Sequence, residues 1–166
     1  MGERNQRLAL KLYIVLMRAS TAVGRHSDAD IAQHDLSPGE FAIMEALYHK
    51  GPLLLGEVQR KILVSSGGVT YLVDRLVAAG YVERRDCPED RRARYAALTA
   101  NGETLIERIF PDHADTIERA LSGLSTAEKR TALELLRKLG TTAAAIPVPG
   151  PPRAAAGSDA TRRDAG

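Results

Sequence analysis

Apolar side chains recur every three or four positions in residues 4–24, a spacing typical of one face of an α-helix. The stripe consists of Leu8, Leu12, Val15, Leu16, Ala19 and Val23. Ile14 and Met17 lie off this stripe, so the predicted helix is apolar on more than one face. Because such a helix usually has more than one partner, we expect it to pack on its own subunit and on another.

A second helix is predicted in "DLSPGEFAIMEALYHKG", residues 35–51. Ser37 is its N-cap, Pro38 occupies the first helical position, and Glu40 completes a capping box. Gly51 and Pro52 end the helix. The expected buried stripe is Phe41, Met44, Leu47 and Tyr48.

Two more short helices are predicted after this one. The first covers roughly residues 55–62. The second begins after Ser65, its expected cap, and runs to about Ala79 before Gly80 terminates it. Its apolar positions have helical spacing and are Val69, Leu72, Val73, Leu76 and Val77.

The period of the pattern changes after Gly80. "YVERR", residues 81–85, alternates between apolar and polar positions, and "RYAALT", residues 94–99, does so more loosely. Between them lies "DCPED", a cluster of turn-forming residues. Two short strands joined by a charged hairpin therefore follow three short helices, which is the order of a winged helix-turn-helix.

Two helical stretches are predicted after the hairpin. Thr99 caps the first, and Pro111 is expected to kink or split it. A capping box from Ser125 to Glu128 starts the second, and Gly140 is its expected end. The inward positions of this last helix are Leu133, Leu136 and Leu139.

We therefore expect a mainly α fold with a small β wing, built as a winged helix-turn-helix plus a helical dimerisation domain. Residues 4–35 form the N-terminal dimerisation helix and linker, and residues 36–99 the DNA-binding domain. Residues 100–145 are the C-terminal dimerisation helices. Residues 146–166 lack apolar periodicity and are predicted to be a disordered tail.

Composition narrows the class of protein. A net charge of +2 over 166 residues permits a nucleic acid partner without requiring one. The single cysteine excludes an internal disulfide and a cysteine-cluster metal site, and it suits a reducing compartment. The apolar run "LYIVLM", residues 12–17, is too short for a membrane span or a signal peptide. We expect a cytoplasmic, nucleoid-associated protein without membrane contact.

The sequence contains none of the patterns that would predict an enzyme. There is no glycine-rich phosphate loop, no nucleophile elbow and no pair of carboxylates in an apolar setting. The four histidines, His26, His34, His49 and His113, are scattered along the chain. A lone histidine is more often solvated or hydrogen-bonded than a metal ligand, so we expect no metal site and no cofactor.

The helix after Ser65 has a polar front that suits the major groove of DNA. This front carries Ser66, Gly67, Thr70, Tyr71, Asp74 and Arg75. Amides at the start of the helix favour phosphate, Thr70 and Tyr71 are candidates for contacts with bases, and Arg75 for a phosphate or a guanine. The alternative is an ordinary surface helix with a weak start at its two glycines.

The hairpin "CPEDRRARYAALT" concentrates arginine next to this helix. Its arginines and those just before it are Arg84, Arg85, Arg91, Arg92 and Arg94. Arginine at a hairpin tip enters a narrow minor groove, where the potential is most negative. Asp90 would orient one guanidinium and leave the other for DNA. The alternative is a solvated hairpin whose surface ion pairs contribute little.

"LSPGEFAIMEAL", "GGVTYLVDRLVAAGYVERR" and "CPEDRRARYAALTANG" together resemble the multiple-antibiotic-resistance regulator (MarR) family. The resemblance is close over residues 36–102. It implies a homodimer in which the N-terminal and the last two helices dimerise and each subunit presents one winged helix to half a palindrome. Carried over, Ser65 to Thr70 open the recognition helix and Arg75 lies on its exposed face. The wing tip then consists of Asp90, Arg91 and Arg92.

Two departures from the family are visible in the recognition helix. Its first positions read Ser66-Gly67-Gly68, where the family often has a bulky polar residue. Tyr71 stands where the family often has an arginine, so a phosphate contact at that position should be weaker. We therefore expect Thr70, Tyr71 and DNA shape to carry more of the sequence reading.

The resemblance implies release from DNA by a small ligand or by thiol oxidation. Cys87 lies near Arg84, Arg85, Arg91 and Arg92, which would favour a reactive thiolate, although nearby acidic residues oppose this; the alternative is an incidental surface cysteine. An aromatic or phenolic effector is a family expectation. The candidate pocket residues, each of which has plain core as its alternative, are Tyr13, Met17, Phe41, Met44 and Tyr48.

These observations predict a homodimeric, sequence-specific transcriptional regulator, a repressor released by an aromatic or quinone-like ligand or by thiol modification. Its expected partners are double-stranded DNA with a pseudo-palindromic operator, a second copy of itself and a small aromatic effector. The alternative is a winged helix that binds another protein without specific DNA binding. Salt dependence distinguishes them, because DNA binding weakens steeply as salt rises.

Overall fold

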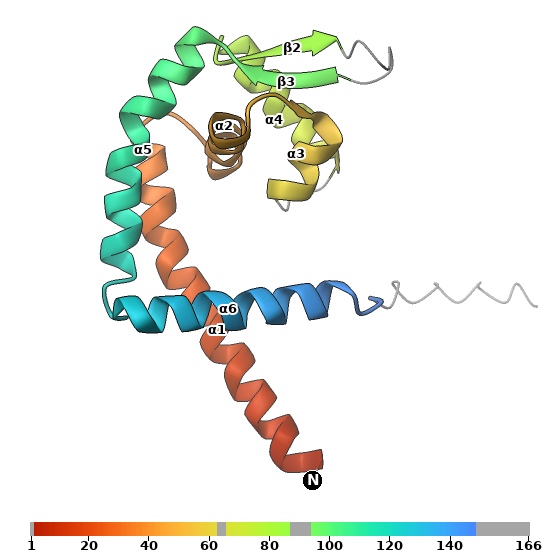
Figure 1. The fold of residues 1–166 in the computed structure, drawn as a ribbon, viewed down its shortest axis with the longest axis vertical. Coiled ribbons are helices and arrows are strands. Elements are labelled where there is room, and N and C mark those ends of the chain that lie inside the picture. The colour runs from red at the N-terminus through yellow and green to blue at the C-terminus, as the bar shows by residue number, and fades with distance from the viewer. Residues whose placement is uncertain (1, 63–65, 87–93, 149–166) are drawn as a thin grey trace, which may run out of the picture. The chain divides into compact units, whose positions relative to one another are not determined.

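The computed structural model describes residues 2–62, 66–86 and 94–148, apart from the side chains of residues 61–62 and 66–67. The chain divides into two compact units, Met1–Gly123 and Leu124–Gly166 (Figure 1). In the part of the chain that is described, no helix is both long enough and apolar enough to cross a membrane. The wing tip and the tail from residue 149 lie outside the described residues.

The first unit follows the predicted winged-helix order. Its helices are α1 (Gly2–Ala32), α2 (Pro38–Lys50), α3 (Leu55–Ile62), α4 (Ser66–Ala78) and α5 (Ala100–Ala120). Its strands are β1 (Leu53–Leu54), β2 (Val82–Asp86) and β3 (Arg94–Leu98). The predicted mainly α fold with a small β wing is confirmed. The strand β1 was not predicted, because two residues carry no readable alternation.

The three strands form an antiparallel sheet in the order β1-β3-β2. In the hairpin, Val82 pairs with Leu98 at one end and Asp86 with Arg94 at the other. Burial does not alternate along these strands. In β2 only Val82 is buried, whereas the last three residues of β3, Ala96 to Leu98, are all buried. The end of the hairpin at Val82 and Leu98 therefore contributes buried residues to the core, whereas the end at Asp86 and Arg94 is charged and exposed.

The predicted helix ends are confirmed around α2 and α4. Ser37 and Glu40 form the capping box of α2, and Gly51 closes that helix with a φ of 74°. Gly80, with a φ of 76°, follows α4. Its amide donates to the carbonyl of Val77, and the amide of Tyr81 donates to that of Leu76. This is a Schellman arrangement, which turns the chain from α4 directly into β2.

The start of α5 is tied to the same turn. The Thr99 hydroxyl caps α5 by accepting from the amide of Gly102, and it donates to the carbonyl of Gly80 at 2.6 Å. The Thr99 amide donates to the carbonyl of Tyr81 at 3.0 Å. A side chain at Gly102 would collide with that carbonyl. Thr99 and Gly102 therefore fix the end of α4 against α5.

The core lies where α2, α4 and α5 meet the sheet. Its fully buried side chains include Ile43, Met44, Val58, Val73, Leu76, Val82, Ile106 and Ile109. Phe41 and Leu47 are buried as predicted, but Tyr48 is 39% exposed, which corrects the expected stripe of α2. That helix buries Glu40 and Ile43 as well, so it is enclosed on several sides rather than along one stripe.

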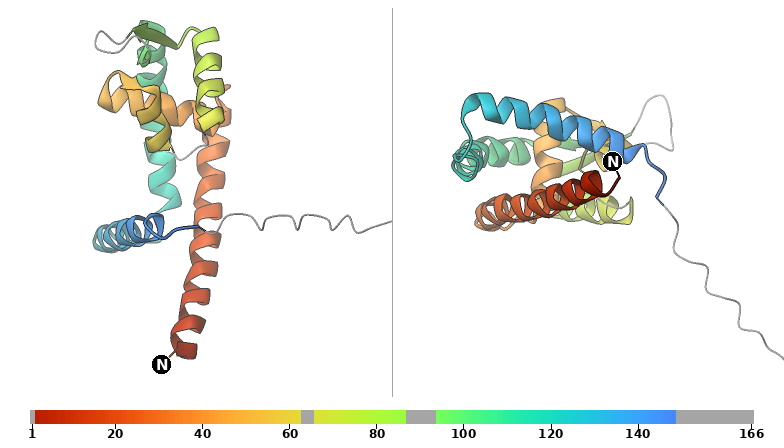
Figure 2. Two further views of the ribbon diagram at one scale, coloured as in Figure 1. Left: turned by 90° about the vertical axis from the view of Figure 1, so that its right-hand side faces the viewer. Right: turned by 90° about the horizontal axis from the view of Figure 1, so that it is seen from below.

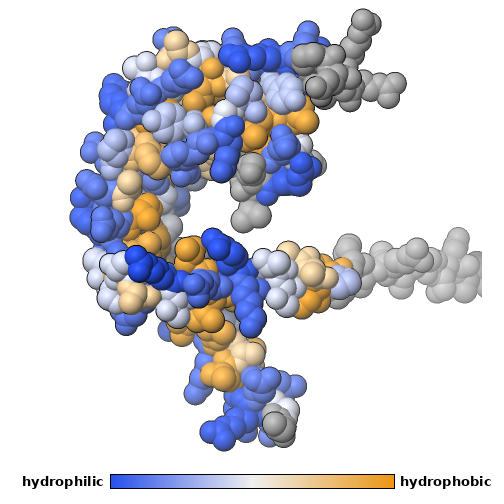
Figure 3. All heavy atoms as spheres, viewed as in Figure 1, coloured by the Kyte–Doolittle hydropathy of each residue, from blue (hydrophilic) through white to orange (hydrophobic). Residues whose placement is uncertain are grey.

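The two long helices of the first unit meet along part of their length. The C-terminal part of α1 packs against α5 and α2, and Ile31 is its buried residue (Figure 2). The N-terminal part of α1 carries exposed apolar side chains, which Figure 3 shows as orange surface along that helix. These are Leu8, Leu10, Leu12, Tyr13, Ile14, Val15 and Met17. Helix α5 runs through Pro111 without being split.

The second unit contains α6 (Thr126–Ala144). The predicted capping box of Ser125 and Glu128 is present. Gly140 was predicted to end the helix, but α6 continues through it to Ala144, because no proline or turn-forming residue follows at once. The leucines predicted to face inward, Leu133, Leu136 and Leu139, are all exposed in the single chain.

Candidate nucleic-acid interface

Helix α4 has a buried back and an exposed polar front. Val69 and Val73 are buried, whereas Thr70 is exposed and Tyr71 is 61% exposed. Ser66 and Gly67 are the first residues of the helix, and Ser65 lies outside the described residues. Side chains on such a front are available to a groove of DNA.

Arg75, near the end of α4, forms an ion pair with a buried carboxylate of α2. Its Nε lies 3.0 Å from Oε1 of Glu40, and the Arg75 side chain remains 50% exposed while that of Glu40 is only 4% exposed. The other carboxylate oxygen of Glu40 accepts from the amide and the hydroxyl of Ser37. One buried carboxylate thus joins the start of α2 to α4.

The neighbouring residue on α4 is tied to the wing. Asp74 forms an ion pair with Arg84 of β2 at 2.7 Å. Both side chains are partly exposed, so the pair contributes little to stability. Its geometric effect is to connect α4 with β2, the first strand of the hairpin.

The base of the wing is a set of paired charges. Arg94 pairs with Asp86, which lies directly opposite in the sheet, and Arg85 pairs with Glu83 at 2.7 Å. Arg94 was predicted to bind DNA, and it is exposed but partly neutralised by this partner. The predicted tip residues Asp90, Arg91 and Arg92, and also Cys87, lie outside the described residues.

The structure does not gather the five predicted pocket residues. Phe41 and Met44 belong to the hydrophobic core, which was the alternative for both. Tyr13 and Met17 are 60% and 48% exposed on α1. Tyr48 is also exposed, and its ring lies 6.3 Å from that of Phe110 and 5.2 Å from that of His49.

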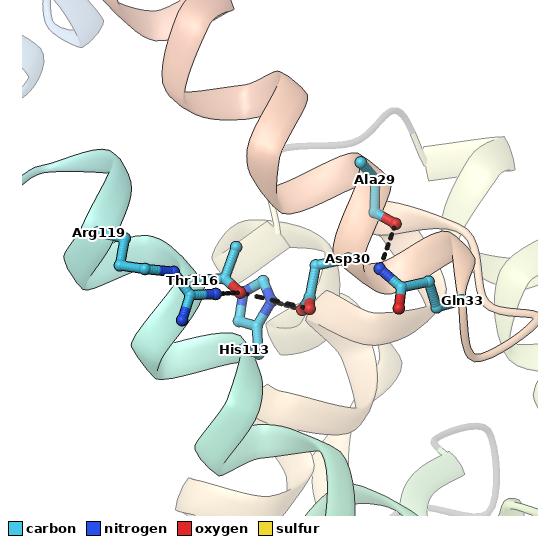
Figure 4. Close-up of polar contacts among 6 residues, drawn as sticks. All are labelled: Ala29, Asp30, Gln33, His113, Thr116 and Arg119. Carbon is cyan, nitrogen blue, oxygen red and sulfur yellow. Dashed lines mark hydrogen bonds and ion pairs between the residues drawn. The ribbon is translucent and has the colours of Figure 1, made fainter.

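A polar cluster joins α1 to α5. Figure 4 shows His113 and Thr116 of α5 directed toward Asp30 of α1, with Arg119 reaching Thr116. The His113 Nδ1 lies 2.8 Å from Oδ2 of Asp30, and the His113 ring lies 4.4 Å from that of Phe41. His113 is thus hydrogen-bonded, as expected for a lone histidine. Among the described residues, no group of three or more Asp, Glu, His or Cys side chains is arranged so that it could hold a metal ion.

Sequence reasoning missed the second role of Glu40 and the pairs of Asp74 and Asp30. The capping box predicted the bonds of Glu40 with its neighbour Ser37. The contact of Glu40 with Arg75 joins two helices that are far apart in the sequence, so it leaves no periodic signal. Asp74 was recognised as part of the front of α4 without its partner. Asp30 and His113 lie 83 positions apart on two different helices, so no local sequence pattern indicated that they are in contact.

Comparison with known proteins identifies the family. Residues 34–93 match a family model described as the MarR family. The HTH-type transcriptional regulator MhqR of Bacillus subtilis (strain 168) is 42% identical over 135 residues, which cover 81% of this chain and 93% of that regulator. The chain belongs to the MarR family. It is therefore a member of a family of DNA-binding transcriptional regulators rather than of enzymes.

Solved structures of other MarR-family regulators share the fold. Sco3205 from Streptomyces coelicolor, crystallised in complex with DNA, matches with a TM-score of 0.74 and 23% identity, covering 86% of this chain and 89% of that one. BpsR of Bordetella bronchiseptica matches with a TM-score of 0.70 and 26% identity, covering 76% and 90%. The structure of BpsR concerns regulation of its DNA binding by 6-hydroxynicotinic acid. The winged-helix fold predicted from the hydrophobic pattern is thus confirmed.

Proposed function

We propose that this MarR-family protein is a homodimeric, sequence-specific transcriptional repressor that acts on DNA in the cytoplasm, at the nucleoid. The observation that carries the proposal is α4, a helix with a buried apolar back and an exposed front that leads directly into an arginine-rich hairpin. A helix of this shape next to a basic ribbon fits the major groove and the adjacent minor groove of DNA.

The residues of α4 divide into two roles. Thr70 and Tyr71 on the exposed front read bases or the shape of the groove. The first residues, Ser65, Ser66 and Gly67, approach the phosphate backbone, because helix N-termini favour anions. Arg75 contributes a phosphate contact at the other end of the exposed front.

The wing supplies the second contact. Arg91 and Arg92 enter the minor groove, and Asp90 orients one of the two guanidinium groups. Arg94 lies on β3, where Asp86 fixes its direction. The paired charges at the base of the wing support a positioning role for Arg94, because its guanidinium already has a carboxylate partner.

A second copy of the chain completes the regulator. Helices α1 and α6 each carry apolar side chains that are exposed in the single chain, and a two-fold dimer would bury such faces. Two recognition helices related by that symmetry read two half-sites about 34–36 Å apart, so the operator is pseudo-palindromic.

Release from DNA is proposed to follow the binding of a small aromatic ligand or modification of Cys87. The relative BpsR, whose DNA binding 6-hydroxynicotinic acid regulates, supports an aromatic effector. Of the predicted pocket residues, Tyr48 is exposed and available to a ligand, Phe41 and Met44 are core, and Tyr13 and Met17 lie on the face of α1 that the proposed dimer would bury. The thiol route rests on the charges around Cys87 in the sequence.

Two variants test the division of labour at the interface. Tyr71→Ala should change the preference among operator sequences with little effect on the salt slope. Arg92→Ala should weaken binding to all sequences and make the negative slope of log K against log salt shallower by about 0.9, the value for one cationic contact with the DNA backbone. Fluorescence anisotropy on a selected operator and on variant operators measures both quantities.

Arg108→Ala is the matched control for Arg92→Ala, because it removes the same charge from the exposed side of α5. Binding by the Arg92 variant as tight as that of the Arg108 variant would contradict the wing assignment. A Cys87→Ser protein that still leaves DNA fully on exposure to quinones and peroxides would exclude the thiol route.

A further inference from the structure

We propose that Glu40 is a positioning residue for DNA recognition. Its buried carboxylate fixes Arg75 of the recognition helix so that the terminal nitrogens of the guanidinium group meet a DNA phosphate. This inference rests on the proposed function, because it assumes that the front of α4 contacts DNA. Glu40 itself lies in α2, outside the recognition helix and the wing.

The two oxygens of the Glu40 carboxylate have separate partners. Oε2 accepts from the Ser37 amide at 2.8 Å and from the Ser37 hydroxyl at 2.6 Å. Oε1 lies 3.0 Å from Nε of Arg75. Because the capping box already fixes the carboxylate to the first turn of α2, Arg75 must adopt the position that Glu40 dictates.

Arg75 keeps part of its binding capacity after this contact. A guanidinium group has five N–H donors in a rigid fork, and its atom nearest to the Glu40 carboxylate is Nε, at 3.0 Å. Half of the side chain is exposed, and among the described residues Glu40 is its one ion-pair partner. The terminal nitrogens therefore suit a bidentate contact with phosphate, whose geometry they match.

A second observation shows that this contact is built into the packing of α2 on α4. A Cβ atom at Gly39 would lie 2.7 Å from Cδ1 of Leu72, which is one helical turn before Arg75. The absence of a side chain at Gly39 thus lets the first turn of α2 approach α4 closely. That approach places Glu40, the next residue, within reach of Arg75.

Stability alone does not explain a buried carboxylate at this place. An ion pair between a buried carboxylate and a half-exposed arginine contributes little net stability, because the desolvation of Glu40 offsets the attraction. A glutamine at the third helical position also forms a capping box. The charge of Glu40 is therefore best explained by the orientation that it imposes on Arg75.

A double-mutant cycle in DNA binding tests the inference. Glu40→Gln keeps a capping box but loses the charge, and it should weaken binding to the selected operator about tenfold. Arg75→Gln should weaken binding at least as much and reduce the salt slope by about one phosphate contact. If Glu40 acts through Arg75, the double variant binds no more weakly than Arg75→Gln alone.

Glu57→Gln is the matched control. Glu57 also lies in the first turn of its helix and accepts a hydrogen bond from a backbone amide, that of Leu54. This variant changes the net charge equally, so it should bind DNA at least as tightly as the parent. Thermal unfolding followed by circular dichroism verifies that each variant is folded at the assay temperature.

Two results would overturn the inference. Binding by Glu40→Gln equal to the parent would show that the orientation of Arg75 does not depend on the carboxylate. A loss that persists in full in the Arg75→Gln background would show that Glu40 acts through the fold of α2. Failure of the parent protein to bind DNA even at low salt would instead refute the proposed function, and this inference with it.

Arg75→Lys provides a test that does not depend on altering the capping box. Lysine keeps the charge but has one nitrogen, which cannot serve Glu40 and a phosphate in the geometry of the guanidinium fork. We expect weaker binding with an unchanged salt slope. Parent-like binding by this variant would contradict the positioning role.

Discussion

Gly102 allows α5 to pack closely against the turn that follows α4. It lies in the first turn of α5, where an added side chain would collide with the carbonyl of Tyr81. Gly102→Ala should therefore lower the free energy of unfolding by about 2–3 kcal/mol, because backbone atoms have to shift. Chemical denaturation measures this change.

The matched control is Gly56→Ala in α3, where a Cβ atom would meet nothing within 4 Å. That change should be neutral or should stabilise the protein by up to about 1 kcal/mol, because alanine has the higher helix propensity. Equal stabilities of the two variants would contradict the close contact between α5 and Tyr81.

At the same scale, sequence reasoning succeeded where a residue acts on its neighbours and failed where it acts at a distance. The caps Ser37, Thr99 and Ser125 are recognisable because their bonds span three positions. The partners of Glu40 and Asp30 lie on other helices, so nothing in the local pattern indicates them. The exposed front of α4 was predictable, whereas its attachment to α2 and β2 was not.

The helical elements are defined by their caps, and the cap of α6 depends on pH. The hydrogen bond from the Ser125 hydroxyl, followed by that from the Ser125 amide, lowers the pKa of Glu128 below its ordinary value of 4.5. A depressed pKa stabilises the folded state fully above the ordinary value and loses this effect as the pH falls through the lower folded value. The start of α6 should therefore weaken in acid.

Glu128→Gln isolates this effect, because glutamine keeps a capping box without titrating. The parent should have the higher midpoint of thermal unfolding at pH 7, and the difference between the two proteins should shrink as the pH falls below 4.5. A difference that is constant from pH 7 to pH 3 would show that the capping bond does not depend on the charge of Glu128.

Elements with strong end signals were predicted closely, and those without them were not. The bounds of α3 and α4 agree with the sequence to within about a residue, and Gly80 marks the end of α4. Helix α1 extends to Ala32, beyond the predicted residue 24, because no glycine or proline after that residue stops it. Gly140 failed as an end signal because an isolated glycine costs a helix only about 1 kcal/mol.

For the whole molecule, the exposed apolar faces are the main feature that a single chain leaves unexplained. Leu136 of α6 is 50% exposed, and Leu12 of α1 is 56% exposed. We expect both to be buried in the homodimer. Leu136→Glu should therefore shift the protein toward a monomer at micromolar concentration, which analytical ultracentrifugation measures as a halved mass.

Lys138→Glu is the control for this change. It introduces the same side chain two positions further along α6, about 200° around the helix axis. This variant should remain a dimer. Monomeric behaviour of the parent protein, or dimerisation by the Leu136 variant as strong as that of the control, would contradict the proposed interface.

The central claim, that this MarR-family protein binds specific DNA through α4 and the wing, is tested most directly by one titration. Fluorescence anisotropy of the purified chain on the DNA upstream of its own gene, with excess unrelated DNA, would be repeated at several salt concentrations. The account predicts binding that resists the competitor and weakens steeply as salt rises. Binding that is absent at low salt, or insensitive to salt, would contradict it and favour a winged helix that binds another protein.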